Sequence, residues 1–203
     1  YVRSPTSKQV RETLWAPTRS SDGPISLVMN LPPVGIAAPA LAQTFQELSE
    51  TNDLGALLDH QSSGRIEAHL NSAAAWLARL GLDTTGDEIV LTNGAQHGIL
   101  MALMACVNPG DTVLVENMTY PPLKQMAHHF GIKLHGLEMD EEGIIPDALE
   151  AACQSTNTKL LYCMPTLRSP TGSTMGAQRR LDIIEVTRKH ELTIIEDDVF
   201  GFL

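Results

Sequence analysis

The residues best suited to chemistry are three consecutive acids, Glu196, Asp197 and Asp198. They follow Leu192–Ile195, a short apolar run rich in β-branched side chains, which is typical of a strand buried on both faces. A buried parallel strand that ends in acids presents them in the crevice where open α/β sheets bind ligands. The same pattern fits a solvated acidic turn, so the choice depends on the other loops.

A second candidate is the segment Thr92–Gln96, Thr-Asn-Gly-Ala-Gln. Gly94 can adopt a backbone conformation closed to other residues, and the N–H groups of Ala95 and Gln96 then begin a predicted helix. Such a helix start favours an anion, because free N–H groups and the helix dipole both attract negative charge. An ordinary strand–helix turn is the alternative. The sequence contains neither the G-x-G-x-x-G nor the P-loop motif.

Two further loops follow predicted strands. In Glu116–Pro122, Tyr120 precedes two prolines and could either stack on a planar ligand or pack in the core. Pro165–Gly172 holds two prolines and a glycine, so we expect a rigid loop in which Arg168 is solvated or meets an anionic ligand. A phosphate cradle, an aromatic face and a buried acid together suit a flat, phosphorylated, basic heteroaromatic ligand such as pyridoxal phosphate.

Alternating elements position these loops. The patterns predict five strands and four intervening helices from residue 87 onward. The strands are 89–92, 112–116, 132–139, 160–164 and 192–195, and the helices are 95–107, 122–130, 146–153 and 177–190. This alternation indicates a three-layer α/β/α fold with a mostly parallel sheet.

The N-terminal part differs in composition. Residues 1–24 are polar and proline-punctuated, so we expect a linker or arm ahead of a domain spanning 25–203. Residues 25–31 could form a short strand. Residues 39–50 are predicted to be a helix with an apolar stripe of Leu41, Phe45 and Leu48, and a longer helix lies within 63–80.

The amino-acid composition limits the molecules and settings that suit this segment. The 203 residues carry a formal net charge of −10, which argues against binding of nucleic acid or an anionic membrane by this segment alone. The longest apolar run, 99–107, is too short to span a bilayer. Three scattered cysteines predict a reducing, cytoplasmic setting. No metal-binding motif is present, and we expect no metal site.

The four segments also carry a family resemblance. Thr-Asn-Gly-Ala-Gln, Tyr-Pro, Pro-Thr-x-x-x-Pro-Thr-Gly and Ile-Ile-Glu-Asp-Asp-x-Phe occur in this order. Residues 25–203 thereby resemble part of the large domain of fold-type I, class I/II aminotransferases. They are most similar to the aminotransferase-like domain of MocR-type regulators in the GntR family.

The resemblance implies pyridoxal 5′-phosphate as cofactor. Gly94, Ala95 and Gln96 would hold its phosphate, and Tyr120 would stack on its ring. Asp197 would pair with the pyridine nitrogen, where a carboxylate keeps the ring protonated and electron-withdrawing.

Three positions depart from the family pattern. Ser169 stands where the family usually has asparagine, and Phe200 where it usually has tyrosine. Both usual residues donate hydrogen bonds to the cofactor's phenolic oxygen; Phe200 cannot donate and serine is shorter. His60 stands where a tyrosine commonly reaches the phosphate of the partner subunit, and it fits a surface histidine equally well.

The Schiff-base lysine of the family is expected downstream of Leu203, since none of the five lysines lies in a matching context. This segment therefore contains no catalytic residue and is expected not to transaminate alone. The resemblance implies an effector domain that senses pyridoxal phosphate or an amino compound, forms a homodimer, and contacts DNA only through a domain N-terminal to this chain. The alternative is a fragment of a catalytic aminotransferase acting on amino acids and 2-oxo acids.

Overall fold

The computed structural model describes residue 35 and residues 37–50 and 63–202, with side chains from Glu67 onward in the second range. Two compact units are present, residues 1–62 and 63–203. In the first, helix α2 (Ala38–Ser49) begins with a proline in its first turn. Its stripe of Leu41, Phe45 and Leu48 is confirmed, and each of these side chains is more than 40% exposed. The possible strand at 25–31 lies outside the described residues.

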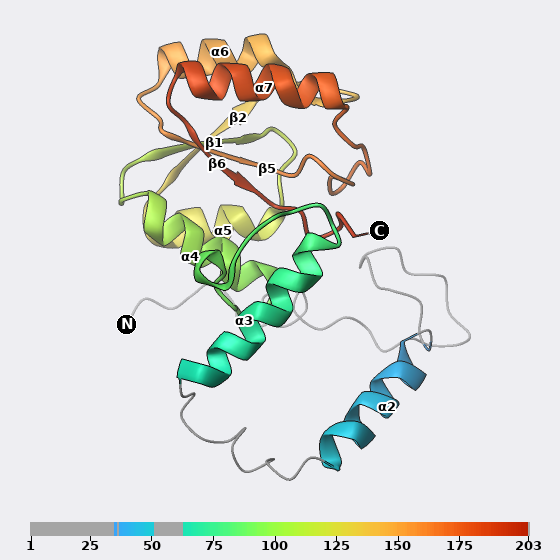
Figure 1. The fold of residues 1–203 in the computed structure, drawn as a ribbon. Helices are drawn as coiled ribbons and strands as arrows, with labels where there is room; N and C mark the ends of the chain where they lie inside the picture. Colours follow the sequence, from blue (N-terminus) through green and yellow to red (C-terminus); the bar gives the residue numbers. More distant parts are fainter. Residues whose placement is uncertain (1–34, 36, 51–62, 203) are drawn as a thin grey trace, which may run out of the picture. The chain divides into compact units, whose positions relative to one another are not determined.

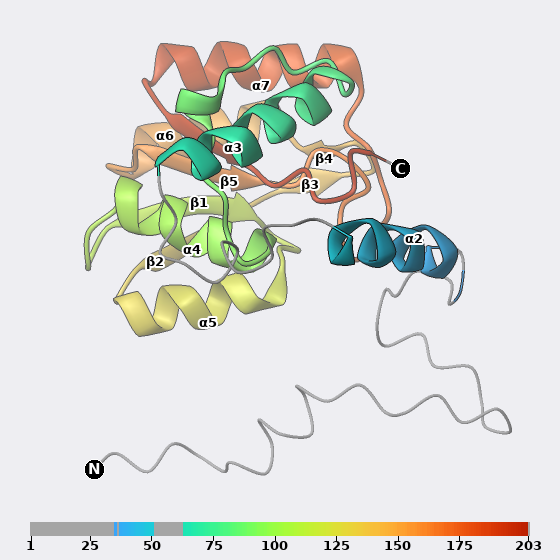
Figure 2. The same ribbon diagram turned by 60° about the horizontal axis from the view of Figure 1, so that its bottom comes forward.

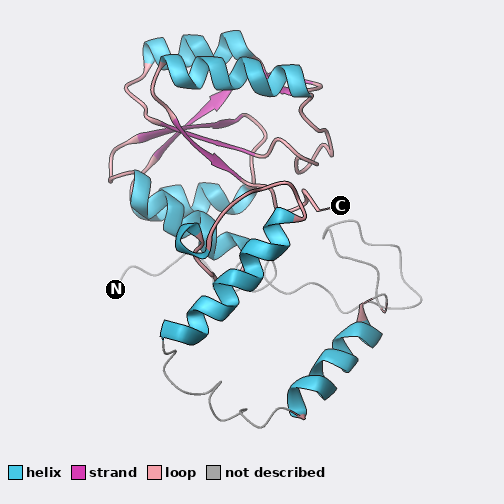
Figure 3. Cartoon of the chain, in the orientation of Figure 1, coloured by secondary structure: helices cyan, strands magenta, loops and turns pink. Residues whose placement is uncertain are grey.

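The second unit is built on a four-stranded parallel sheet in the order β2-β1-β5-β6. Figure 3 shows the strands of this sheet between helices. The strands are β1 (Thr112–Glu116), β2 (Lys133–Leu137), β5 (Leu160–Cys163) and β6 (Thr193–Glu196). The remaining elements are α3 (Ser63–Ala78), η2 (Gly86–Glu88), α4 (Ala95–Cys106), α5 (Pro121–Phe130), α6 (Pro146–Ser155), α7 (Ala177–Lys189) and an antiparallel ribbon of β3 (Met139–Asp140) and β4 (Gly143–Ile144).

Helices cover both faces of the sheet. Helices α4 and α5 lie on one face and α6 and α7 on the other (Figures 1 and 2). Alternate residues of β5 supply the two cores, because successive strand side chains point to opposite faces. Leu160 and Tyr162 join the core under α4 and α5, whereas Leu161 and Cys163 join the core under α6 and α7. The predicted three-layer α/β/α fold is confirmed.

The prediction of a strand at 89–92 is wrong. Ile89 is extended, with φ −109° and ψ 133°, but the segment pairs with no strand among the described residues. Val90 and Leu91 are 69% and 52% exposed. Their apolar, β-branched pattern favours a strand, but a strand also needs a neighbour to take its backbone hydrogen bonds. The predicted strand at 132–139 is divided into β2 and β3. Within the described residues, no helix is both long and apolar enough to cross a membrane.

Candidate functional site

The topology brings the candidate loops to one edge of the sheet. β1, β5 and β6 are parallel, so the loops that follow them leave from the same edge. Helix α4 leads into the start of β1 through a short connection and packs on the sheet through Ile99 and Leu103. It therefore runs back against β1, and its first turn lies at the edge where the strands end.

The start of α4 has free backbone donors. Gly94 is the N-cap residue, with φ 83° and ψ 166°, and no side chain caps the helix. The Gly94 carbonyl accepts from the N–H groups of His97 (3.1 Å) and Gly98 (3.2 Å). Within the described residues, the N–H groups of Ala95 and Gln96 have no acceptor, and all three residues from Gly94 to Gln96 are exposed. This arrangement suits an anion.

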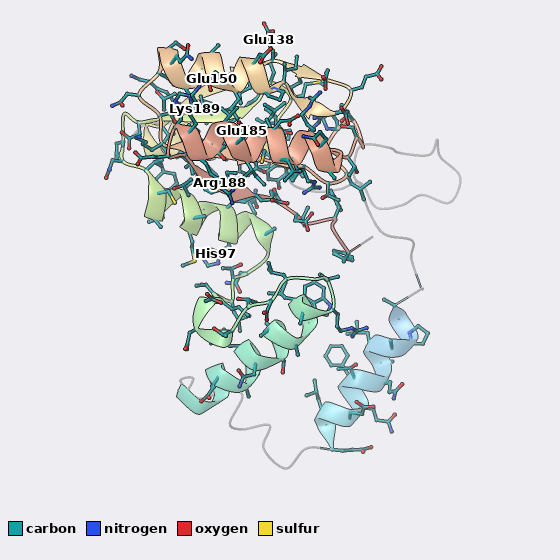
Figure 4. The ribbon with its side chains drawn as sticks, turned by 45° about the horizontal axis from the view of Figure 1, so that its top comes forward. His97, Glu138, Glu150, Glu185, Arg188 and Lys189 are labelled. Carbon is teal, nitrogen blue, oxygen red and sulfur yellow. The ribbon has the colours of Figure 1, made fainter. Side chains whose placement is uncertain are left out.

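His97 stabilises the same loop, in the first turn of α4 (Figure 4). Its Nδ1 atom accepts a hydrogen bond of 3.1 Å from the Asn93 N–H. The Thr92 hydroxyl also donates to the Gly94 carbonyl, at 3.1 Å. The conformation of the loop is thus fixed by side chains of its own, leaving the backbone donors of Ala95 and Gln96 available.

The three acids after β6 occupy different environments. Asp197 is 8% exposed; its N–H donates to the Cys163 carbonyl at 2.9 Å, and its Oδ2 atom accepts from the Tyr162 hydroxyl at 2.6 Å. Glu196 is half exposed and pairs with Arg180 at 3.3 Å. Asp198 is exposed. Asp197 is therefore the one of these three acids that is buried at the strand end.

Tyr120 lies within the electrostatic influence of Asp197, and Phe200 follows Asp197 by three residues. Both are partly buried against the core under α4 and α5. Burial, and then the negative charge of Asp197, raise the pKa of the Tyr120 hydroxyl above its usual value of 10.0. The structure thus brings Tyr120 near Asp197 and places Phe200 against the same core as Tyr120. It shows Tyr120 in a packing role, and its stacking on a ring stays a prediction.

The expectation that Arg168 is solvated is wrong. Arg168 is 3% exposed, and its Nη1 atom lies 3.6 Å from Oε1 of Glu116, which is fully buried. The other carboxylate oxygen of Glu116 accepts from the Met164 N–H at 3.1 Å. Burial raises the pKa of Glu116 to about 7, against the opposing effects of the Met164 N–H and Arg168. A buried carboxylate is costly without a partner, and the guanidinium supplies one.

A glycine makes room for this pair. Gly143, in β4, has φ 121°, and a Cβ atom there would lie 2.9 Å from Arg168 Nη1. The Arg168 Nε also donates to the Thr171 hydroxyl at 3.2 Å, inside its own loop. The sequence held one signal for the pair, since Glu116 ends a strand that is otherwise apolar and a buried acid requires a cation or a proton.

Ser169 and His60 are the least defined site predictions. Ser169 is partly buried beside Arg168, and its hydroxyl has no hydrogen-bond partner in the described part of the chain. His60 lies outside the described residues.

Two surface hollows lie elsewhere, one of about 490 Å³ between α6 and α7 and one of about 330 Å³ between β2 and α6. Across the described ranges, no cluster of histidine, cysteine and acidic residues could hold a metal ion.

Comparison with known proteins identifies the family. The family model described as "Aminotransferase class I and II" matches residues 30–202. The chain belongs to this family. Among curated relatives, the chain is similar to the uncharacterized HTH-type transcriptional regulator YjiR of Escherichia coli. The two are 33% identical over 202 residues, which cover 96% of this chain and 41% of YjiR.

An enzyme of the family is similar over a shorter stretch. The chain is 34% identical over 122 residues to an aromatic amino acid aminotransferase of Schizosaccharomyces pombe, covering 57% of this chain and 26% of that protein. Among solved structures, an archaeal alanine:glyoxylate aminotransferase superposes with a TM-score of 0.72 at 27% identity, covering 82% of this chain and 42% of that one. The chain thus spans about a quarter to two fifths of the length of these relatives.

Proposed function

We propose that the strand-end edge of this class I and II aminotransferase chain binds pyridoxal 5′-phosphate. The residues present suit its phosphate, its ring and its ring nitrogen. The free N–H groups of Ala95 and Gln96, with Gly94 preceding them, would hold the phosphate. Tyr120 would lie against the ring, and Asp197 would pair with its nitrogen. When bound, the cofactor acts as an electron sink for a substrate carbanion.

One observation carries this proposal. The buried Asp197 carboxylate stands at the same sheet edge as an uncapped helix start, so a carboxylate and free anion-binding donors would lie on one side of a bound ligand. A ligand that is cationic at one end and anionic at the other fits both. Phe200 has no hydrogen-bond donor, and the side chain of Ser169 is shorter than the asparagine of the family pattern. Contacts to the phenolic oxygen would therefore be weaker than in that pattern.

We further propose that the chain is an effector domain of a MocR-type regulator of the GntR family. The extent of similarity supports this, because the match to YjiR covers 96% of the chain and the match to the yeast aminotransferase only 57%. The domain would be a cytoplasmic homodimer that senses the cofactor or an amino compound. With a net charge of −10 in this segment, contact with DNA would require an N-terminal domain not in this chain.

The second candidate function is catalysis by a complete aminotransferase. The 34% identity to the yeast enzyme favours it. In that case the full-length protein would exchange amino groups between an amino acid and a 2-oxo acid, with a Schiff-base lysine downstream of Leu203. Asp197 would perform the same task in either protein, which is to hold a proton on the pyridine nitrogen.

The test compares Asp197→Asn with the control Asp198→Asn in the full-length protein that contains this sequence. Titration with pyridoxal phosphate, followed by visible absorbance, is expected to show at least a tenfold loss of affinity for the first variant and little change for the second. Equal affinities would contradict the assignment of Asp197.

A gel-shift assay on the gene's own upstream DNA, alongside a transamination assay with a panel of amino acids, separates regulator from enzyme.

A further inference from the structure

Tyr162 lies under Asp197 and belongs to none of the motifs in the sequence. It is fully buried in β5, in the core beneath α4 and α5. Its ring packs among apolar side chains, but its hydroxyl is directed at a carboxylate. A phenylalanine would satisfy the packing equally well, so the hydroxyl calls for a separate explanation.

Two contacts with β5 fix Asp197. The Tyr162 hydroxyl donates to Oδ2 at 2.6 Å, which is the short distance typical of a hydrogen bond to an ionised acceptor. The Asp197 N–H donates to the Cys163 carbonyl at 2.9 Å and continues the register in which Tyr162 faces Ile195. Backbone and side chain of Asp197 are therefore both held by consecutive residues of one strand.

The direction of the hydrogen bond is also fixed. Burial, the hydrogen bond and the charge of Asp197 all raise the pKa of the Tyr162 hydroxyl far above its usual 10.0. It remains a neutral phenol throughout the physiological range and keeps the proton that it donates to Asp197 Oδ2. The second carboxylate oxygen, Oδ1, has no hydrogen bond with any described residue, although the residue is 8% exposed.

We infer that Tyr162 is a positioning residue, which holds Asp197 by one oxygen and leaves the other for the nitrogen of a pyridine-type ligand. This inference rests on the proposed cofactor site. Without the hydroxyl, the buried carboxylate would lose its side-chain donor and its fixed orientation, and would be a poorer partner for a pyridinium.

The experiment uses Tyr162→Phe in the full-length protein. Affinity for pyridoxal phosphate is expected to fall about tenfold. The second measurement is the nitrogen NMR shift of bound cofactor labelled with ¹⁵N in the ring. It is expected to move from the value of a protonated pyridine toward that of a neutral one, which a purely structural loss would not cause.

The matched control is Thr158→Val. Thr158 is buried near the opposite end of the same strand, where its hydroxyl donates to the Thr112 carbonyl at 2.6 Å. This variant also removes a buried hydroxyl hydrogen bond, but cofactor affinity and nitrogen shift should stay unchanged. If Tyr162→Phe does not fold, 4-fluorophenylalanine at this position fills the volume without donating, and 4-aminophenylalanine restores an N–H donor.

The outcomes separate the two proposals. Absence of cofactor binding by the unsubstituted protein would overturn the proposed function and this inference with it. Binding by the unsubstituted protein, with the same affinity and nitrogen shift in the non-donating variants, would overturn the role of Tyr162 alone. Recovery of both quantities by the amino analogue is the result expected if the donor is what matters.

Discussion

Two regions of the protein use the same kinds of charged side chain in opposite ways. The strand-end cluster consists of Glu116, Tyr162, Arg168 and Asp197, all less than 9% exposed. The outer network lies on and beside α6 and α7. It links Glu150 to Lys189 and His190, and Arg179 to Asp140 and Glu142. Figure 4 labels Glu150 and Lys189 on these two helices.

The contrast is clearest for two glutamates. Burial raises the pKa of Glu116 to about 7 although Arg168 lies close to it. Hydrogen bonds from Lys189 and then His190 lower the pKa of Glu150 to about 2. The same side chain is thus driven in opposite directions, because desolvation dominates at the strand ends and partners dominate at the surface. Desolvated charges at a ligand-facing edge are typical of functional sites.

The largest effect is expected for Arg168→Met. The variant leaves Glu116 buried beside no cation, and at pH 8, above its pKa, the free energy of unfolding should drop by about 3 kcal/mol. Urea unfolding of the full-length protein measures it. The control is Lys189→Met, which removes a partner of Glu150 at the surface and should change the melting temperature by no more than about 2 °C. Similar losses in the two variants would show that burial does not distinguish the regions.

The next effect is a pH dependence. Because the folded-state pKa of Glu116, about 7, exceeds its usual 4.5, the folded protein binds the extra proton. This contribution to stability is complete below pH 4.5 and is lost as pH rises through 7. Each unit of pKa shift corresponds to about 1.4 kcal/mol, so the shift from 4.5 to about 7 makes the loss roughly 3 kcal/mol. Glu116→Gln should remove this slope, measured by urea unfolding between pH 4.5 and 8; an unchanged slope would assign it to another group.

Much of this contrast could not be predicted from sequence. Periodicity located β1, β5, β6 and their helices, and glycine at 94 indicated the open helix start. The partners of side chains were not predictable in the same way. Arg168 sits in a polar loop and gives no local sign of being buried, because its contact with Glu116 joins residues 52 positions apart and depends on the space left by Gly143.

In the segment 89–92 the local sequence pattern was clear but led to a wrong prediction. Its residues have the strand pattern, yet a local pattern cannot supply the neighbour that completes a sheet, and none of the described strands pairs with this segment. Tyr162 was missed for a third reason. A tyrosine in an apolar strand is indistinguishable from a core aromatic until the residue opposite its hydroxyl is known, which here is Asp197, 35 positions away.

A moderate effect is expected for Phe200→Tyr, which adds a donor near the strand-end cluster. If the edge binds pyridoxal phosphate as proposed, the hydroxyl should strengthen binding about fivefold, since one net hydrogen bond is worth roughly 1 kcal/mol. Cofactor titration of the full-length protein measures this change. Ser169→Asn, which restores the other donor of the family pattern, should act in the same direction. Weaker binding in both variants would place the phenolic oxygen away from these residues.

The smallest effect is expected in the outer network, for Glu150→Gln. The folded-state pKa of Glu150, about 2, lies below its usual 4.5, so its contribution to stability is present above pH 4.5 and lost as pH falls toward 2. This slope is opposite in sign to that of Glu116. Because Glu150 and its partners Lys189 and His190 lie at the surface, the melting temperature of the variant at pH 6 should change by about 2 °C or less. Glu185→Gln is the control, an exposed acid on α7 with no ion pair among the described residues. A loss for Glu150→Gln as large as that for Arg168→Met would mean that partner geometry, rather than burial, sets the energy of charges in this fold.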